Sequence, residues 1–511
     1  MSSEEQLGES NFLKNQGTKI DIKSLEVVKS HSEKELDLGA EFLAKNSEHA
    51  DYTPAEARKV LFKIDLMLMP IMTVATTLAA ADKIVISNAA LYGMETDCKL
   101  VGQQYSWIAS IFYFGYLGME APANYLIQRY PVAKCLGISF IIWSSILMCI
   151  GAANNFATLA ALRFLLGMGE TFLFPALTVI TSMFYRKKEQ PFRTAIWFSG
   201  FSSLITGSLS YGIGTSNSSV ASWRLLFITF GAITFGISWI MLILIPDSPM
   251  KCRFFSTREK YIAIDRTKEN RTGTKNKVFK KDQAIEALLS PTTWCMAIFV
   301  FSINIANGGL VSFAAQIVSG LGYSEHRTVL MGLPTGVFMT FSSWLIALPC
   351  LVVPGKFRTV ITAIVTLCPL ICCVLMMKLT DKISRLLAYY FFYFYWGPYV
   401  SMCSLSMANT SGHTKKTVVN AINFISYCVA NIVAPQFFLS SQSPEYPTGY
   451  DAILSFLAVS IVTILIYGLL CILENKKRNK KYGIVDSSYK MELDILDLTD
   501  IQKAEVFRYT W

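Results

Sequence analysis

The sequence predicts an all-α membrane protein with twelve transmembrane helices in two six-helix bundles. Of the 511 residues, 52% are hydrophobic and only 16% are charged, a balance that is too apolar for a soluble domain of this size. Hydrophobic runs of about 20 residues recur along the chain, and that length spans a bilayer as a helix. Each run must be helical in hydrocarbon, because no water is available to satisfy the backbone amides.

The hydrophobic runs number twelve, in two groups of six. They lie at 64–86, 104–127, 132–152, 156–184, 194–215, 223–245, 292–318, 328–350, 357–377, 384–408, 417–440 and 449–473. The predicted domains are therefore a polar tail at 1–62, a bundle at 63–245, a linker at 246–291, a bundle at 292–473 and a second tail at 474–511. Many secondary transporters are built in this way, with a substrate site near the bilayer midplane between repeats.

The basic residues predict the orientation of the chain in the membrane. They cluster at 58–63, 186–188, 251–281, 415–416 and 476–481, which all fall on one side if there are twelve spans, so both termini should be cytoplasmic. Residues 377–385 are the exception, as a basic loop on the other side. The net charge of +10 then indicates topology and contact with anionic lipid rather than nucleic acid. The linker stretch STREKYIAIDRTKENR is compatible either with an amphipathic surface helix or with a solvated tether.

Charged residues inside the spans are the first candidates for function, because they are costly in hydrocarbon. Arg163 and Glu170 lie seven residues apart in the fourth run, on one helix face but too distant to pair well with each other. Asp82 and Lys83 lie in the outer half of the first run, at the depth of Arg163. We expect an ion pair between Asp82 and Arg163, and an isolated Glu170 near the bilayer centre. Desolvation would make that carboxylate take up a proton readily.

Alternative roles stay open for each of these residues. Arg163 and Asp82 could form a fixed pair that only aligns helices, and Glu170 could bond to a hydroxyl such as Thr171 or Ser182. Lys83 could extend to the outer water layer. Glu120, the remaining intramembrane acid, lies beside Pro122 near the cytoplasmic end of the second run, where a structural or gating role is at least as reasonable as ion coupling.

The second half contains no clearly buried charge, and its polar candidates are amides and phenols. They include Asn304, Asn307, Tyr393 and Asn423, which could bind the body of a polar solute. Gly308 and Gly309 follow Asn307 and mark the place where this helix is expected to unwind or, alternatively, to pack closely. Lys83 and Arg163 together can neutralise Asp82 and leave one cation, which favours an anionic solute such as a carboxylate.

Several reaction classes find no support in the sequence. The four histidines lie in tails or loops and nearly all cysteines in predicted helices, so we expect no metal site, no cofactor and no disulfide framework. No nucleophile, base and orienting group cluster, so the chain is not expected to be an enzyme. The expected partners are a small organic anion, a proton as coupling ion and the lipid bilayer, with no nucleic acid, and the protein is expected to be a monomer.

Four segments resemble one family, the fungal allantoate permease family of anion:cation symporters within the major facilitator superfamily. These are IPDSPMKCRFFSTREKYIAIDRTKENRTG, NIANGGLVSFAAQIVSGLGYS, NTSGHTKKTVVNAINFISYCVANIVAPQFF and DLTDIQKAEVFRYTW, and the likeness runs from Arg58 to Trp511. The resemblance implies the major facilitator fold and an alternating-access carrier that takes up an organic anion with protons. It assigns coupling and carboxylate recognition to residues that match Asp82, Lys83, Arg163 and Glu170. Lys83 departs from the family, where arginine is commoner, and a lysine cannot make a planar bidentate contact.

The function expected from the resemblance is proton-coupled import of a carboxylate across the plasma membrane. Family members carry allantoate, ureidosuccinate, nicotinate, pantothenate and related acids, so the resemblance does not select one. Two alternatives remain. One is an uncoupled or exchange carrier, or a carrier in the endoplasmic reticulum or another internal membrane. The other is a transporter-like nutrient sensor that signals through its tails.

Overall fold

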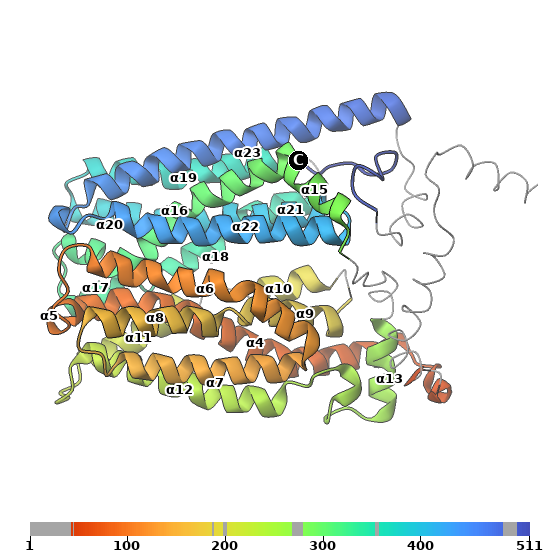
Figure 1. Cartoon of the computed structure of the whole chain (residues 1–511), viewed down its shortest axis with the longest axis horizontal. Helices are drawn as coiled ribbons and strands as arrows, with labels where there is room; N and C mark the ends of the chain where they lie inside the picture. Colours follow the sequence, from red (N-terminus) through yellow and green to blue (C-terminus); the bar gives the residue numbers. More distant parts are fainter. Residues whose placement is uncertain are drawn as a thin grey trace, which may run out of the picture.

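The computed structural model describes residues 42–43, 45–186, 189–197, 202–267, 279–352, 357–483 and 498–511. Most of the tail predicted at 1–62, Lys187 and Lys188, and residues 268–278 of the linker lie outside these ranges. The described elements are all helical. They form two groups of long helices that lie side by side, one from the first half of the chain and one from the second (Figure 1).

The first bundle is built from six helical segments. They are α4 (Pro54–Leu91), α6 (Gln104–Arg129), α7 (Val132–Ile150), α8 (Phe156–Glu170) followed by α9 (Leu173–Phe184), α10 (Gln190–Trp197) followed by α11 (Ser202–Gly214), and α12 (Ser222–Leu244). The short helix α5 (Met94–Asp97) joins α4 to α6. α4 begins before the predicted run, because Thr53 caps it in a reciprocal box with Glu56 and Pro54 occupies the first turn.

The second bundle repeats this plan with six segments. They are α16 (Pro291–Gly320), α17 (Glu325–Met331) followed by α18 (Thr335–Val352), α19 (Arg358–Lys378), α20 (Lys382–Phe392) followed by η3 (Tyr393–Tyr395) and α21 (Trp396–Asn409), α22 (His413–Val433) followed by η4 (Ala434–Phe437), and α23 (Pro447–Tyr482). α23 continues past the predicted limit at 473 through a basic stretch, because lysine and arginine are good helix formers once outside the bilayer.

The twelve predicted runs correspond to these segments, and the predicted fold class is confirmed. Within the described residues, nine helices are long and apolar enough to cross a membrane by length and composition. The other three runs correspond to α6, to α10 with α11, and to α20 with α21. Hydropathy is weaker or the helix is interrupted in these three, and they contribute residues to the site between the bundles.

Prolines explain where several spans are interrupted. Pro175 follows the break between α8 and α9, Pro334 is the last residue of the break between α17 and α18, and Pro398 follows the 3₁₀ turn η3. A proline has no N–H to give to the carbonyl four residues earlier, so the hydrogen-bond ladder opens there. Pro122, by contrast, is accommodated within an unbroken α6. The first of these breaks comes directly after Glu170.

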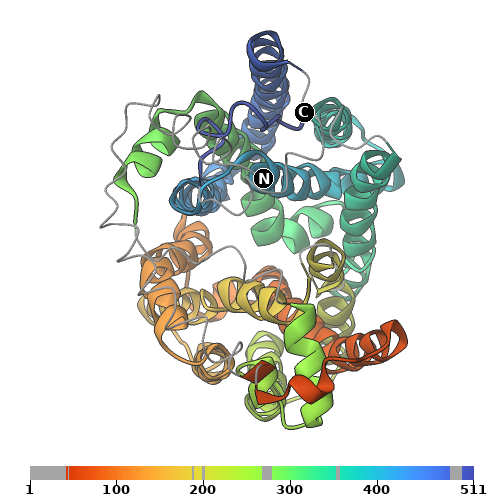
Figure 2. The ribbon, with the colours of Figure 1, turned by 90° about the vertical axis from the view of Figure 1, so that its right-hand side faces the viewer.

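The linker divides between the two bundles. Its first part, α13 (Thr257–Arg266), packs on α4 with Tyr261, Ile262 and Ile264 buried. Of the two interpretations of this stretch, the amphipathic helix is the one observed, and its apolar face contacts protein. The second part, α15 (Lys281–Leu289), packs on α22. We call the end of the molecule that carries α13 and α15 the linker face (Figure 2).

Ion pairs attach each part of the linker to its own bundle. Lys63 of α4 bonds Glu259 of α13 at 2.9 Å. In the second bundle, Lys415 of α22 contacts Glu286 of α15 at 2.7 Å and Asp500 of the C-terminal segment at 2.6 Å. The segment at 498–511 therefore lies at the linker face. The segment before α4 lies there too, because the Tyr52 hydroxyl donates to Asp265 of α13 at 2.7 Å.

Hydrogen bonds join the bundles toward the opposite face, the end that carries α5. The Tyr105 hydroxyl donates to the carbonyl oxygen of Ser312 at 2.5 Å, and the amide of Ala315 donates to Oγ of Ser87 at 2.9 Å. Farther out, Gln316 donates to the carboxylate of Glu95 at 3.1 Å. These contacts close the space between the bundles on the side of α5.

Candidate functional site

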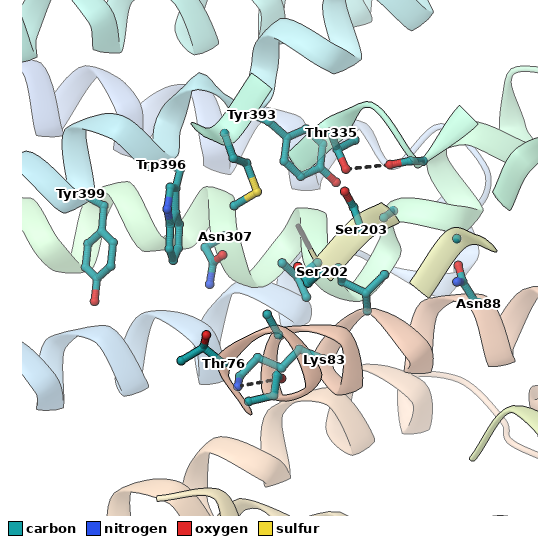
Figure 3. A pocket seen from close by; sticks show the side chains of 18 of the residues that line it. Thr76, Lys83, Asn88, Ser202, Ser203, Asn307, Thr335, Tyr393, Trp396 and Tyr399 are labelled. Carbon is teal, nitrogen blue, oxygen red and sulfur yellow. Dashed lines mark hydrogen bonds between the residues drawn. The ribbon is translucent and has the colours of Figure 1, made fainter. Parts of the chain in front are cut away.

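A cavity of about 380 Å³ lies between the two bundles. Side chains from α4, α6, α9 and α11 line one side, and side chains from α16, α17, α18, α20, η3, α21 and α22 line the other. Figure 3 shows Thr76 and Lys83 projecting from α4 toward Asn307, Trp396 and Tyr399. Among the described residues that line the cavity, Lys83 and Glu120 are the charged ones. The cavity is large enough for a small organic solute.

Two glycines bring α6 and α8 into backbone contact beside this cavity. A Cβ on Gly115 would lie 2.0 Å from the carbonyl oxygen of Phe164, and a Cβ on Gly167 would lie 2.0 Å from that of Phe112. Only glycine fits at such a distance. The contact places the ring of Phe112 against the Arg163 guanidinium, 5.0 Å from ring centroid to Cζ. Close packing therefore fixes the face of α8 that carries Arg163.

Arg163 and Asp82 form the predicted ion pair. Nη1 of Arg163 lies 3.9 Å from Oδ1 of Asp82, and both side chains are almost fully buried. The indole N–H of Trp143 on α7 donates to Oδ2 of Asp82 at 3.0 Å. Gly169 permits this approach, because the Trp143 backbone and Cβ lie directly against it. Neither Arg163 nor Asp82 lines the cavity, so this pair holds α4, α7 and α8 together behind the cavity wall.

Glu170 is not isolated, which corrects the sequence-based expectation. Nζ of Lys83 bonds Oε1 of Glu170, and the Glu170 side chain is fully buried. Adjacent residues on a helix point about 100° apart, so Asp82 and Lys83 can face the two charges of α8 separately. Thr171 and Ser182, the hydroxyls considered for Glu170, bond backbone carbonyls instead.

Lys83 is held at the boundary between Glu170 and the cavity. Its side chain is 16% exposed, and Nζ lies 5.3 Å from the ring centroid of Phe112 and 5.9 Å from that of Tyr116. These rings add a modest attraction for the ammonium. Lys83 therefore turns inward and does not extend to the outer water layer. The ammonium can contact both the buried carboxylate and a solute in the cavity.

The opposite wall of the cavity is neutral and aromatic. Asn307 is held in a chain of hydrogen bonds, in which the Tyr395 hydroxyl donates to its oxygen at 2.8 Å and its amide donates to Asn431 at 2.9 Å. Asn431 in turn donates to the backbone of Tyr427 at 2.8 Å. Tyr393, which was predicted to bind substrate, lines the cavity and shares a 3.0 Å hydrogen bond with Tyr389. One Asn307 amide hydrogen and the ring faces remain available to a solute.

The structure places other sequence candidates away from the cavity. Asn304 is buried and donates to the carbonyl oxygen of Val300 at 2.7 Å, and Asn423 donates to Ser406 at 3.2 Å. Neither is among the residues that line the cavity. The helix does not unwind at Gly308 and Gly309, which corrects that expectation. α16 runs unbroken through both, and both lie in tight contact with side chains of neighbouring elements.

Glu120 lines the cavity on α6, together with Tyr116 one turn away. Asn124 donates to Oε1 of Glu120 at 2.8 Å, and Oε2 is buried without a hydrogen-bond partner in the described part of the chain. Pro122 lies between Glu120 and Asn124 but is exposed. Of the two, only Glu120 faces the site.

Sequence reasoning missed much of the aromatic wall and the hydrogen bond that Trp143 donates to Asp82. The cavity residues not predicted include Thr76, Asn88, Tyr116, Ser202, Ser203, Thr335, Tyr389, Trp396, Tyr399, Phe424 and Tyr427. The run YYFFYFYW at 389–396 was a usable signal for part of this wall. Trp143 carried no signal, because a tryptophan in an apolar helix normally indicates lipid contact or core packing.

The arrangement can exchange an ion pair for a bound anion. Two cations and two carboxylates balance when Glu170 is ionised, and one positive charge remains when Glu170 is protonated. Among these four groups, only Lys83 also faces the cavity. Within the described residues, no group of three or more His, Cys, Asp or Glu side chains is placed to hold a metal ion.

Comparison with known proteins finds similarity over most of the chain. The sequence model of the Major Facilitator Superfamily matches residues 72–435. The allantoate permease of Saccharomyces cerevisiae is 35% identical, with 92% of this chain and 89% of the relative covered. The MFS-type transporter cnsL of Penicillium expansum is 32% identical over 95% of each chain. The thiamine pathway transporter THI73 of Saccharomyces cerevisiae is 30% identical over 89% of this chain and 86% of that protein.

Solved transporter structures share the same fold. The proton:xylose symporter XylE bound to 6-bromo-6-deoxy-D-glucose has a TM-score of 0.62 at 13% identity, covering 82% of this chain and 97% of that one. A bacterial homologue of the human lysosomal transporter Spinster, in an inward-facing and unoccupied conformation, has a TM-score of 0.58 at 15% identity, covering 82% and 96%. At these identities the likeness concerns the arrangement of helices alone.

Proposed function

The chain belongs to the Major Facilitator Superfamily and is a secondary transporter, and from this premise we propose that it imports a small organic anion together with a proton. The anion is a carboxylate, and transport proceeds by alternating access between the bundles. Glu170 carries the proton, and Lys83 binds the carboxylate.

The observation that supports this proposal is the position of Lys83 between Glu170 and the cavity. With Glu170 ionised, the ammonium is occupied by the buried carboxylate. Protonation of Glu170 removes that charge and leaves the ammonium available to a solute carboxylate, which then restores neutrality. Proton and anion therefore bind together more favourably than either binds alone, which is the linkage that a symporter requires.

Return of the empty carrier follows from the same pair. When the anion and the proton leave, Lys83 and Glu170 neutralise each other, so the four groups Asp82, Lys83, Arg163 and Glu170 together carry no net charge. The bundles can then reorient without the large cost of moving a buried charge. Asp82 and Arg163, predicted to act in coupling and in substrate binding, are proposed to preserve the position of Lys83, because Asp82 and Lys83 are adjacent on α4.

The second bundle is proposed to recognise the body of the solute. Asn307 offers one amide hydrogen, Tyr393 a hydroxyl, and the rings of Trp396 and Tyr399 an apolar surface opposite Lys83 (Figure 3). One relative is named for allantoate, which combines a carboxylate with a polar body. Ureidosuccinate, nicotinate and related acids likewise combine a carboxylate with a polar or flat body.

The proposed location is the plasma membrane, with the linker face toward the cytoplasm. The basic residues at this face, including Arg186 and Lys415, support that orientation through the positive-inside preference. The contacts near α5 then close the site to the outside, as between Gln316 and Glu95. The protein is proposed to act as a monomer, because the cavity lies within one chain.

Two other functions remain candidates. An uncoupled or exchange carrier, in the plasma membrane or in an internal membrane, would use the same cavity but would not respond to a proton gradient. A nutrient sensor would bind the solute and signal through the tails, and removal of the tails would then abolish the growth response. The first of these is separated from symport by the pH dependence of uptake.

Uptake of labelled allantoate, nicotinate and pantothenate by cells that express the wild type or Glu170→Gln tests the proposal. Acid outside should stimulate accumulation by the wild type. Glu170→Gln mimics the protonated carboxyl, so it should still exchange internal for external anion but should lose accumulation driven by acid. Protein at the cell surface is quantified for both. Equal accumulation by the two proteins at acid and neutral pH would contradict proton coupling through Glu170.

A further inference from the structure

Glu120 is the carboxylate that lines the cavity among the described residues, and it has no counter-charge in the described part of the chain. The other intramembrane carboxylates each face a cation, Asp82 facing Arg163 and Glu170 facing Lys83. Glu120 receives one hydrogen bond from Asn124, and its Oε2 atom is buried without a partner. A buried carboxylate that lacks a cation is expensive when ionised and inexpensive when protonated.

The position of Glu120 relates it to the Lys83–Glu170 pair. Lys83 lies over the ring of Tyr116, and Glu120 follows Tyr116 by four residues, about 6 Å farther along α6 toward the linker face. The Tyr116 phenol is within electrostatic range of both Glu170 and Glu120. Both Lys83 and Glu120 line the same cavity. Among the described residues that line the cavity, Glu120 is therefore the carboxylate that lies between Glu170 and the linker face.

The other ionisable groups around Glu120 come from neighbouring helices. Cys428 on α22 is within electrostatic range of both Glu120 and Lys83, and Tyr399 on α21 is within range of Tyr116. The phenols and the thiol are neutral at physiological pH and do not neutralise a carboxylate. Glu120 thus has neutral neighbours, and its own protonation is the simplest way to remove its charge.

We propose that Glu120 is the acceptor of the coupling proton, taking it from Glu170 and releasing it to the cytoplasm. In this step an O–H bond of the Glu170 carboxylic acid breaks, an O–H bond forms on Glu120, and a water molecule in the cavity carries the proton between them. Glu170 becomes a carboxylate and re-forms its pair with Lys83, which displaces the anion. Glu120 then loses the proton to water at the linker face. The charge of the site is conserved in the transfer.

This inference rests on the proposed symport and assigns the exit route of the proton. It also gives the order of events after the cavity opens to the cytoplasm. Deprotonation of Glu170 precedes release of the proton into bulk water, so the Lys83–Glu170 pair re-forms while the proton is still held by the protein. A purely structural Glu120 would influence every mode of transport equally.

Transport by Glu120→Gln separates these possibilities. The assay uses proteoliposomes supplied with an equimolar mixture of labelled allantoate, nicotinate and pantothenate. In Glu120→Gln, accumulation driven by a proton gradient should fall at least about tenfold relative to the wild type, because loss of a proton-transfer group typically costs that much or more. Exchange of internal for external anion needs no net proton release and should stay within about twofold of the wild type. Glu120→Asp should recover part of the driven uptake. Unchanged driven uptake, or an equal loss in both assays, would overturn the assignment.

Infrared difference spectra supply a readout that needs no solute. Purified wild type in lipid, compared between acid and neutral pH, should gain carbonyl bands of protonated carboxylic acids, and Glu120→Gln should lack one of them. Glu170→Gln should lack a different one. If Glu120→Gln leaves the spectrum unchanged while Glu170→Gln alters it, the relay fails but the proposed symport survives. If neither variant alters it and wild-type uptake ignores pH, the proposed symport fails as well.

Discussion

The first bundle and the second bundle face the same cavity with opposite chemistry. On the first side, Lys83, Arg163, Asp82, Glu120 and Glu170 lie at the cavity or directly behind its wall, and four of these five groups form pairs. On the second side, the residues described at the cavity are uncharged, and they comprise one amide (Asn307), hydroxyls, aromatic rings and aliphatic side chains. Asn307 is held there by hydrogen bonds with Tyr395 and Asn431. Placing a charged side chain within the membrane costs more free energy than placing a neutral polar one. The first bundle therefore carries the groups that are more costly to bury, and the second bundle carries the less costly ones.

This difference indicates that substrate specificity and energy coupling depend on different residues of the molecule. Coupling requires groups that gain and lose protons, and these lie on α4, α6 and α8. Recognition of the solute body requires shape and hydrogen bonds, and these lie on α16, η3 and α21. A substitution on one side should therefore change pH dependence, and a substitution on the other should change apparent affinity.

Loss of Lys83 is expected to have the largest effect. Lys83→Met removes the cation for the anion and leaves the buried Glu170 carboxylate unpaired, so uptake should fall more than about thirtyfold and the free energy of unfolding by about 3–5 kcal/mol. Uptake and thermal unfolding of the purified protein measure the two effects. Lys83→Arg keeps the charge and should retain part of the uptake.

The double variant Lys83→Met, Glu170→Gln sharpens this result. Both charges are removed, so thermal stability should return toward that of the wild type while uptake stays absent. Recovery of uptake in the double variant would break the comparison, because the first bundle would then recognise the solute without its cation.

A smaller effect is expected from Asn307→Ala in the second bundle. The change leaves the Tyr395 hydroxyl and the Asn431 oxygen without their partners, which should cost about 1–3 kcal/mol of stability and raise KM about tenfold. The ratio of uptake at acid and neutral pH should stay as in the wild type. A changed pH ratio would show that the second bundle also takes part in coupling.

The smallest effect is expected from Asn304→Ala, which is the matched control on the same helix. Asn304 lies one turn from Asn307, but its amide bonds only the carbonyl oxygen of Val300 and its own oxygen has no partner among the described residues. KM should stay within about twofold of the wild type and stability within about 1 kcal/mol. A large rise in KM would mean that the solute extends past the cavity wall to Asn304.

Hydropathy predicts this fold well, because the bilayer leaves a long apolar run few conformations besides a helix. Each of the twelve runs coincides with a helical segment, and the polar linker falls between α12 and α16. The interruptions were harder to place. Pro175 and Pro398 accompany a break, whereas Pro70 and Pro122 lie inside continuous helices, so a proline alone does not decide whether a helix divides.

The candidate site was predictable only where one residue type is rare in its surroundings. Asp82, Lys83, Arg163 and Glu170 are conspicuous in apolar helices, and the pairing of Asp82 with Arg163 followed from their depth. The bond between Lys83 and Glu170 depends on which face of α8 is turned toward α4, and the glycine contacts between α6 and α8 help to fix that face. Asn304 and Asn307 are a second example. Both are asparagines on α16, and only the packing of that helix decides which of them faces the cavity.

The divided linker has a consequence for observing the protein at work. α13 is attached to the first bundle through Lys63 and Glu259, and α15 to the second through Lys415 and Glu286. Two fluorophores on the exposed surfaces of these helices would therefore form an optical ruler outside the membrane. The distance between the dyes would report each opening and closing cycle in single molecules, with the transport cavity left unmodified.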